Sequence, residues 1–291
     1  MRHIISLTTI PPRFASLGPL LQVLRDQSSR PEAVELWLPR RYRRFPGYGG
    51  ALPDLPEGIT LRLTDEDLGP ATKVLPAARA RRGEAVEILF CDDDHIYGPR
   101  WAAGLLAARA RHPEAAVAAA ATTLAAMGRP WNAPGPLPRA KMAVPHTEQR
   151  LFRLRRGLLA LRHGGRGRIP LMAPFRTVDR AGYADFFEGY GGVALAPDML
   201  DDAAFDIPPV LWSVDDVWLS GHLARRGIPI WTEPGLHRAR AQHGVSRTDP
   251  LYAAIIQGKG RRDANRACID HFRQTYGIWG GSDAGSASQS T

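Results

Sequence analysis

The stretch Val86-Glu-Ile-Leu-Phe-Cys-Asp-Asp-Asp94 decides the fold of this chain. Its first part is mainly apolar and rich in branched and aromatic side chains, which predicts a buried strand over residues 86–91. In open α/β sheets ligands bind outside the carboxyl ends of the strands, so the three aspartates stand where a site is expected. Adjacent carboxylates repel one another unless a cation offsets them, and their hard oxygens suit Mg²⁺ or Mn²⁺. The alternative interpretation is a solvated acidic turn.

Strand and helix patterns alternate around this stretch in the first 120 residues. Strands are expected near 3–8, 32–38, 59–64, 86–91 and 115–120. Helices are expected near 16–28, 71–82 and 99–111, and a later helix and strand near 213–226 and 228–232. Strands joined by crossover helices imply a mainly parallel sheet, so the expected fold class is α/β.

The composition is that of a globular protein with a basic surface. Of the 291 residues 44% are hydrophobic and 23% charged, and the net charge is +9. This charge favours anionic partners: nucleic acid, phosphorylated substrates or an anionic membrane surface. A bias of composition toward arginine is the alternative explanation. No apolar run reaches the length of a membrane span, the N-terminus lacks a signal-peptide pattern, and Cys91 and Cys268 form no disulfide framework, so a cytoplasmic protein is expected.

The expected organisation is one catalytic domain followed by a short extension. The domain spans residues 1–245 and carries a basic insertion at about 128–180. Residues 246–279 are expected to form a helical extension, and 280–291 a disordered tail. Within the insertion, Glu148–Arg162 predicts a basic amphipathic helix with leucines among five arginines. This helix fits a lid, an acceptor surface or contact with anionic lipid; the alternative is a solvated helix packed on the sheet by its leucines.

The loop after the first strand offers polar groups to a nucleotide. Thr8 and Thr9 supply hydroxyls and Arg13 a positive charge for phosphate, although capping of a helix by threonine explains this loop equally well. A second segment combines Asp67, a Gly-Pro turn and Lys73. Asp67 is an acceptor for a base or ribose, and Lys73, in the first turn of the helix that follows, faces phosphates drawn to its N-terminus. An acidic capping loop followed by an exposed lysine is the alternative.

Two later segments also carry candidate site residues. The turn Glu188-Gly-Tyr-Gly-Gly192 lets a sugar or acceptor approach the backbone closely, or is an ordinary tight turn. Ser213 is the expected N-cap of the helix at 213–226, which puts Asp215 and Asp216 in its first turn. Acidic residues stabilise a helix there, so helix chemistry alone explains the pair. A carboxylate facing a shared pocket is also well placed to take a proton from an attacking hydroxyl.

These segments together resemble GT-A fold glycosyltransferases over roughly residues 3–245. The resemblance implies a GT-A, Rossmann-like fold with a mixed, mainly parallel sheet flanked by helices. The acidic triplet corresponds to the DxD motif of that family, which carries a divalent metal bound to the diphosphate of a nucleotide sugar. The pair Asp215-Asp216 resembles the acidic motif of inverting members, although it is Asp-Asp where the family has Glu-Asp.

The resemblance also implies a role for each residue. Asp216 is the expected general base and Asp215 its support. The expected metal ligands are Asp92, Asp94 and a C-terminal histidine, for which His243 is preferred over His237. The residues expected to bind the nucleotide and its phosphates are Thr8, Thr9, Arg13, Asp67, Lys73, Asp92 and Asp93.

The implied activity is a metal-dependent glycosyl transfer of the hexosyltransferase class, with Mn²⁺ or Mg²⁺ as cofactor. The donor is a nucleotide sugar, with a UDP-sugar favoured, and the acceptor a glycan or a lipid-linked molecule. Inversion is expected with Asp216 as base, and retention if no base stands opposite the leaving group. Peripheral contact with an anionic membrane is expected, and contact with nucleic acid is not, because aromatic residues are not interleaved with the basic ones. A sugar nucleotidylyltransferase is a rival, but residues 8–13 lack the glycine- and arginine-rich loop such enzymes carry.

Overall fold

The computed structural model describes residues 1–131, 135–162, 164, 174, 176–236, 239–242, 244–251, 258 and 260–280. Eight strands of this described part form one sheet in the order β10-β13-β6-β12-β4-β1-β2-β3. Their bounds are β1 (His3–Thr8), β2 (Ala33–Pro39), β3 (Ile59–Thr64), β4 (Glu87–Phe90), β6 (Ala116–Ala118), β10 (Gly182–Ala184), β12 (Val193–Leu195) and β13 (Ile230–Thr232).

The sheet is mixed and mainly parallel. Strands β3, β2, β1 and β4 run parallel, β12 pairs antiparallel with both β4 and β6, and β13 runs parallel to β6. Strand β10 closes the edge antiparallel to β13. The α/β class with a mixed, mainly parallel sheet is therefore confirmed, and the arrangement fits the GT-A type.

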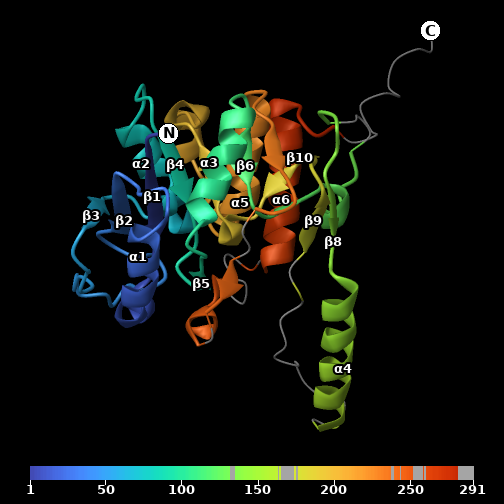
Figure 1. The fold of residues 1–291 in the computed structure, drawn as a ribbon, viewed down its shortest axis with the longest axis horizontal. Coiled ribbons are helices and arrows are strands. Elements are labelled where there is room, and N and C mark those ends of the chain that lie inside the picture. Colours follow the sequence, from blue (N-terminus) through green and yellow to red (C-terminus); the bar gives the residue numbers. More distant parts are fainter. Residues whose placement is uncertain are drawn as a thin grey trace.

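Helices cover both faces of the sheet (Figure 1). They are α1 (Gly18–Arg25), α2 (Leu75–Ala80), α3 (Trp101–Arg111), α5 (Asp215–Arg225) and α6 (Arg261–Tyr276). Side chains of α1 and α3 pack in one core cluster, and those of α2, α5 and α6 in a second cluster across the sheet. Strand β4 contributes Ile88 and Phe90 to one cluster and Leu89 to the other. Burial on both faces is the reason why this segment is a near-continuous apolar run.

The described residues form three two-stranded ladders outside the main sheet. They pair β7 (Ala121–Thr122) with β11 (Phe186–Phe187), β14 (Arg240–Ala241) with β5 (His95–Ile96), and β8 (Lys141–Ala143) with β9 (Thr177–Arg180). The ladder of β5 and β14 joins the residues directly after the acidic triplet to the C-terminal part of the chain.

The helix α4 (His146–Arg162) confirms the amphipathic helix expected in the insertion. It extends away from the body of the molecule (Figure 1), and none of its residues is buried. Among the described residues, no helix has the length and apolar character needed to cross a bilayer. Both Cys91 and Cys268 are free and buried. The domain limits at 245 and 279 stay predictions, and residues 281–291 of the expected tail lie outside the described part.

Two local expectations are wrong. The helix expected over 71–82 is a 3₁₀ helix, η2 (Gly69–Lys73), followed by the short α2. Pro76 has no N–H to continue an earlier helix and instead stands in the first turn of a new one. Ser213 is not the N-cap of α5, because the cap residue is Val214 and no side chain caps this helix end. Asp215 and Asp216 nevertheless stand in its first turn, as expected.

Candidate active site

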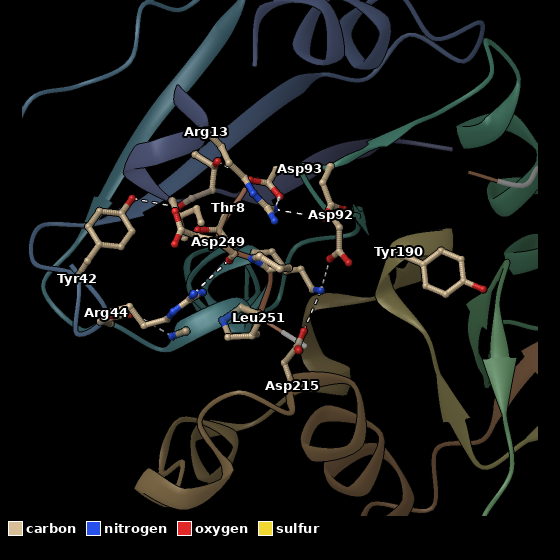
Figure 2. A pocket seen from close by; sticks show the side chains of 18 of the residues that line it. Thr8, Arg13, Tyr42, Arg44, Asp92, Asp93, Tyr190, Asp215, Asp249 and Leu251 are labelled. Atoms are coloured by element: carbon tan, nitrogen blue, oxygen red, sulfur yellow. Dashed lines mark hydrogen bonds and ion pairs between the residues drawn. The ribbon is translucent and has the colours of Figure 1, made fainter. Parts of the chain in front are cut away.

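One pocket opens at the carboxyl ends of β1 and β4, where the sequence predicts a site. Figure 2 shows side chains from distant segments converging on it. All ten described residues with an expected role line this pocket: Thr8, Thr9, Arg13, Asp67, Lys73, Asp92, Asp93, Asp94, Asp215 and Asp216. The structure therefore brings these segments, far apart in sequence, together at one place.

Lys73 joins two of the acidic segments. Its buried Nζ lies 2.5 Å from Asp92 Oδ1 and 2.8 Å from Asp215 Oδ2. Burial alone would lower the pKa of Lys73, but Asp215 and Asp92 raise it well above its usual value, so the side chain stays an ammonium. Ser6 Oγ donates to the carbonyl oxygen of Lys73 at 2.6 Å and ties η2 to β1.

Lys73 does not occupy the place expected for it on the helix. It is the last residue of η2 instead of a residue in the first turn of a longer helix, and its ammonium pairs with two carboxylates. The ammonium therefore places a positive charge between the acidic triplet and the first turn of α5.

Asp216 stands next to this ion-pair network with a pKa suited to a base. Burial, and then the neighbouring charge of Asp215, raises the pKa of Asp216 to about 7, although Lys73 opposes the shift. Its Oδ1 accepts a hydrogen bond of 2.9 Å from the N–H of Gly189, and Arg261 Nη2 lies 3.7 Å from its Oδ2. The carboxyl group is thus held in place while part of it still faces the pocket.

The glycine-rich turn serves two purposes. A Cβ on Gly189 would lie 2.6 Å from Lys73 Nζ and 2.9 Å from Asp216 Oδ1, so glycine lets this backbone reach the polar cluster. At Gly192, with φ +95°, a Cβ would lie 2.4 Å from the ring of Trp101. Trp101 Nε1 also donates to the carbonyl oxygen of Gly191 at 2.9 Å. The first glycine makes room for the site, and the second is required by packing.

A group that fits a divalent cation lies next to the ion-pair network of Lys73 and shares Asp92 with it. Asp92, Asp94 and His95 each offer a ligand atom, and these atoms lie within 4.8 Å of one another. His95 Nδ1 is 2.6 Å from Asp94 Oδ1, and the imidazole stacks on Tyr190. The two carboxylates suit Mn²⁺ or Mg²⁺, and the imidazole offers a nitrogen ligand beside them. Both histidines expected as ligands, His237 and His243, lie outside the described residues.

Asp93 is turned away from this group and braces the loop after β1. Its Oδ2 accepts a hydrogen bond of 2.5 Å from Thr9 Oγ1, and its Oδ1 lies 2.5 Å from Arg13 Nη1. Burial raises the pKa of Asp93 to about 6, although Arg13 opposes the shift. Arg13 also donates from Nε to the carbonyl oxygen of Thr248 at 3.1 Å. These three side chains fix the pocket wall, and their roles in nucleotide binding stay predictions.

Asp67 and Thr8 are also engaged within the protein. The carboxylate of Asp67 accepts hydrogen bonds from the N–H of Arg43 at 2.6 Å and of Gly69 at 2.9 Å. Thr8 Oγ1 donates to the carbonyl oxygen of Trp37 at 2.7 Å. Both residues therefore shape the wall of the pocket, and contact with a base or ribose stays a prediction for each.

Sequence reasoning missed several residues of this site. His95 directly follows the triplet. A histidine next to three aspartates was the signal that could have identified it as a metal ligand. Arg261 begins α6 and reaches Asp216 from the C-terminal part of the chain, which no local pattern reveals. Tyr42 and Phe45 from one loop, and Trp212 from a distant segment, supply aromatic side chains to the wall of the pocket. Arg44 Nη2 donates to the carbonyl oxygen of Asp249 at 3.1 Å and closes the wall on that side (Figure 2).

Comparison with known proteins gives only distant similarity. No protein-family model and no curated protein matches this chain. Three solved structures of TarS from S. aureus are similar over 94% of this chain at 13% identity. The fragment 1–349 alone and its complex with UDP have TM-scores of 0.43 and 0.42, each with 70% of that chain covered, and a longer TarS structure has 0.42 with 43% covered. Similarity at this level gives no information on what this protein binds or transfers.

Proposed function

We propose that this protein is a glycosyltransferase that moves a sugar from a nucleotide diphosphate sugar to a hydroxyl group of a glycan or lipid-linked acceptor. One observation carries the proposal: a carboxyl group with a pKa of about 7, Asp216, lies in the same pocket as the group Asp92, Asp94 and His95. Such a carboxyl group suits proton removal from an acceptor hydroxyl near neutral pH. The two carboxylates and the imidazole suit a cation that a diphosphate requires.

The reaction would be a displacement at the anomeric carbon. The acceptor oxygen forms a bond to this carbon, its proton passes to a carboxylate oxygen of Asp216, and the bond from the carbon to the diphosphate oxygen breaks. Attack opposite to the leaving group inverts the anomeric centre. The Lys73 ammonium, held between Asp92 and Asp215, offers positive charge near the place where the leaving diphosphate gains negative charge.

Asp92, Asp94 and His95 are the residues that would hold Mn²⁺ or Mg²⁺. When bound, the cation would neutralise charge on the leaving diphosphate. The favoured donor is a UDP-sugar. Calorimetric titration with UDP-, GDP-, CMP- and dTDP-sugars, with and without Mn²⁺, tests the donor: binding of one nucleotide class that requires metal supports the proposal. A folded protein that binds none of these donors refutes it.

Replacing Asp94 by alanine should abolish metal-dependent binding of the donor. The change removes one of two carboxylates from the candidate metal group, and Arg13, 3.4 Å away, retains its closer partner Asp93. We expect the affinity for the nucleotide sugar in Mn²⁺ to fall to the level measured in EDTA, with the thermal midpoint little changed. Calorimetry of both proteins measures this. Asp54→Ala is a control outside the pocket, and equal donor affinity in the Asp94 variant and the parent would remove Asp94 from the metal site.

The rate of transfer should follow the ionisation of Asp216. Because the base acts as carboxylate and its pKa is raised to about 7, kcat/KM should be high above pH 7 and fall about tenfold per pH unit well below it. Arg261 favours the charged form of Asp216, so Arg261→Gln should move the midpoint to higher pH. Rates measured between pH 5 and 9 test this. Arg262→Gln, at an exposed position of the same helix, should leave the midpoint in place, and a profile flat through pH 7 would exclude Asp216 as base.

A further inference from the structure

The projecting helix α4 carries an apolar stripe that the proposed activity does not use. Leu151, Leu154, Leu158 and Leu161 are spaced three and four residues apart, so they lie along one face of the helix. Their exposed fractions are 53%, 62%, 55% and 80%. Single exposed leucines need no explanation, but a row of four on one helix marks a contact surface.

Arginines border this leucine stripe on both sides. A helix turns about 100° per residue, which places Arg150 along one edge of the stripe and Arg155 and Arg162 along the other. Arg153 and Arg156 lie on the remaining surface, so the helix holds five arginines, and its one acidic residue is Glu148. The surface is therefore apolar in the middle and positively charged along its margins.

This pattern selects among three classes of partner. A second copy of α4 packed along the stripe would bring the bordering arginines of both helices together, and like charges at such positions oppose pairing. Nucleic acid would neutralise the arginines but would leave the leucines in water. An anionic bilayer satisfies both features, since leucines enter the boundary of the acyl chains while arginines stay among the headgroups.

We infer that α4 docks this protein on an anionic membrane surface through the leucine stripe and its bordering arginines. Figure 1 shows α4 extending past the body on the side where β5 lies, and β5 directly follows the acidic triplet. An amphipathic helix lies in the plane of the interface, so docking would place the bilayer along the axis of α4. The inference does not depend on the proposed glycosyl transfer.

Co-sedimentation with vesicles tests the docking. The full chain should bind vesicles of equal parts phosphatidylcholine and phosphatidylglycerol, and should bind weakly or not at all to phosphatidylcholine alone. Leu154→Gln with Leu158→Gln should weaken binding to the anionic vesicles about tenfold or more. Replacing Arg150, Arg155 and Arg162 by glutamine should weaken it about fivefold for each arginine, and added salt should act in the same direction. Because α4 has no buried residue, these variants should keep the thermal midpoint of the parent.

A matched variant separates docking by α4 from general adhesion. Leu52 is 51% exposed and lies far from α4 in sequence, so Leu52→Gln should bind vesicles like the parent. Equal binding of the leucine variant and the parent would overturn the inference, as would the absence of binding to anionic vesicles. A dimer in sedimentation velocity that the leucine variant abolishes, without vesicle binding, would assign the stripe to a second copy. Salt-dependent binding to DNA without vesicle binding would assign the arginines to nucleic acid. Each of these outcomes would contradict docking of α4 on a membrane.

Discussion

Asp216→Asn is expected to lower kcat for sugar transfer by about 10³ while the nucleotide sugar still binds. Asparagine has the same shape as aspartate, and its carbonyl oxygen can still accept the hydrogen bond from the Gly189 N–H. It lacks the ability to take a proton from the acceptor hydroxyl at neutral pH. The loss should therefore appear in the chemical step and not in donor affinity, which kinetics and calorimetry of the same preparation measure separately.

The control for this variant is a second aspartate in the first turn of a helix. Asp263 has this position in α6 and is exposed, so Asp263→Asn changes the charge at a helix start without touching the pocket. We expect it to retain the full rate. Full turnover by Asp216→Asn would assign the proton to another group. The anomeric configuration of the product, read by NMR, adds an independent check, since a retained configuration contradicts direct displacement.

The sheet could be predicted because its strands carry their own signals. The apolar run at 86–91 and the strand at 3–8 are buried on both faces, so each carries apolar side chains for both core clusters and stands out from the loops. The α5 helix was also identified from its pattern. Its start was misplaced because Ser213 is a favourable cap by type, whereas the helix begins without any side-chain cap.

The sequence could predict which residues belong to the site, but not which residues they contact. The aspartates and Lys73 were identified as candidate site residues, because ligands bind at the carboxyl ends of strands in α/β sheets and carboxylates and a lysine there suit a metal and phosphates. Sequence could not show that Asp93 is held by Arg13 and Thr9 while its neighbours Asp92 and Asp94 group with His95, since successive side chains point in different directions. Arg261 could not be predicted for a different reason, because its contact with Asp216 depends on how α6 packs on α5.

Lys73→Met is expected to produce the largest loss of stability among single changes in the pocket. The Lys73 side chain is 3% exposed and that of Asp215 4%, so removal of the ammonium leaves a buried carboxylate without its cation. Breaking such a pair costs roughly 3–5 kcal/mol of unfolding free energy, which urea denaturation at pH 7 measures. The effect should be present throughout the neutral range. Because Asp215 and Asp92 raise the pKa of Lys73, its stabilisation is complete at pH values below the pKa of the unfolded chain and disappears only when the pH rises through the higher folded pKa.

A second substitution separates the buried charge from lost packing. If the cost arises from the unpaired carboxylate, Asp215→Asn introduced into the Lys73→Met variant should recover part of the stability, although alone it also destabilises. The exposed pair of Arg2 and Glu32 is the matched comparison, and Arg2→Met should change stability little because water already surrounds both charges. Strictly additive losses at Lys73 and Asp215 would show that their ion pair does not hold η2 and α5 together. The recovery we expect would show that the pair whose charge serves the pocket also joins the two elements that form it.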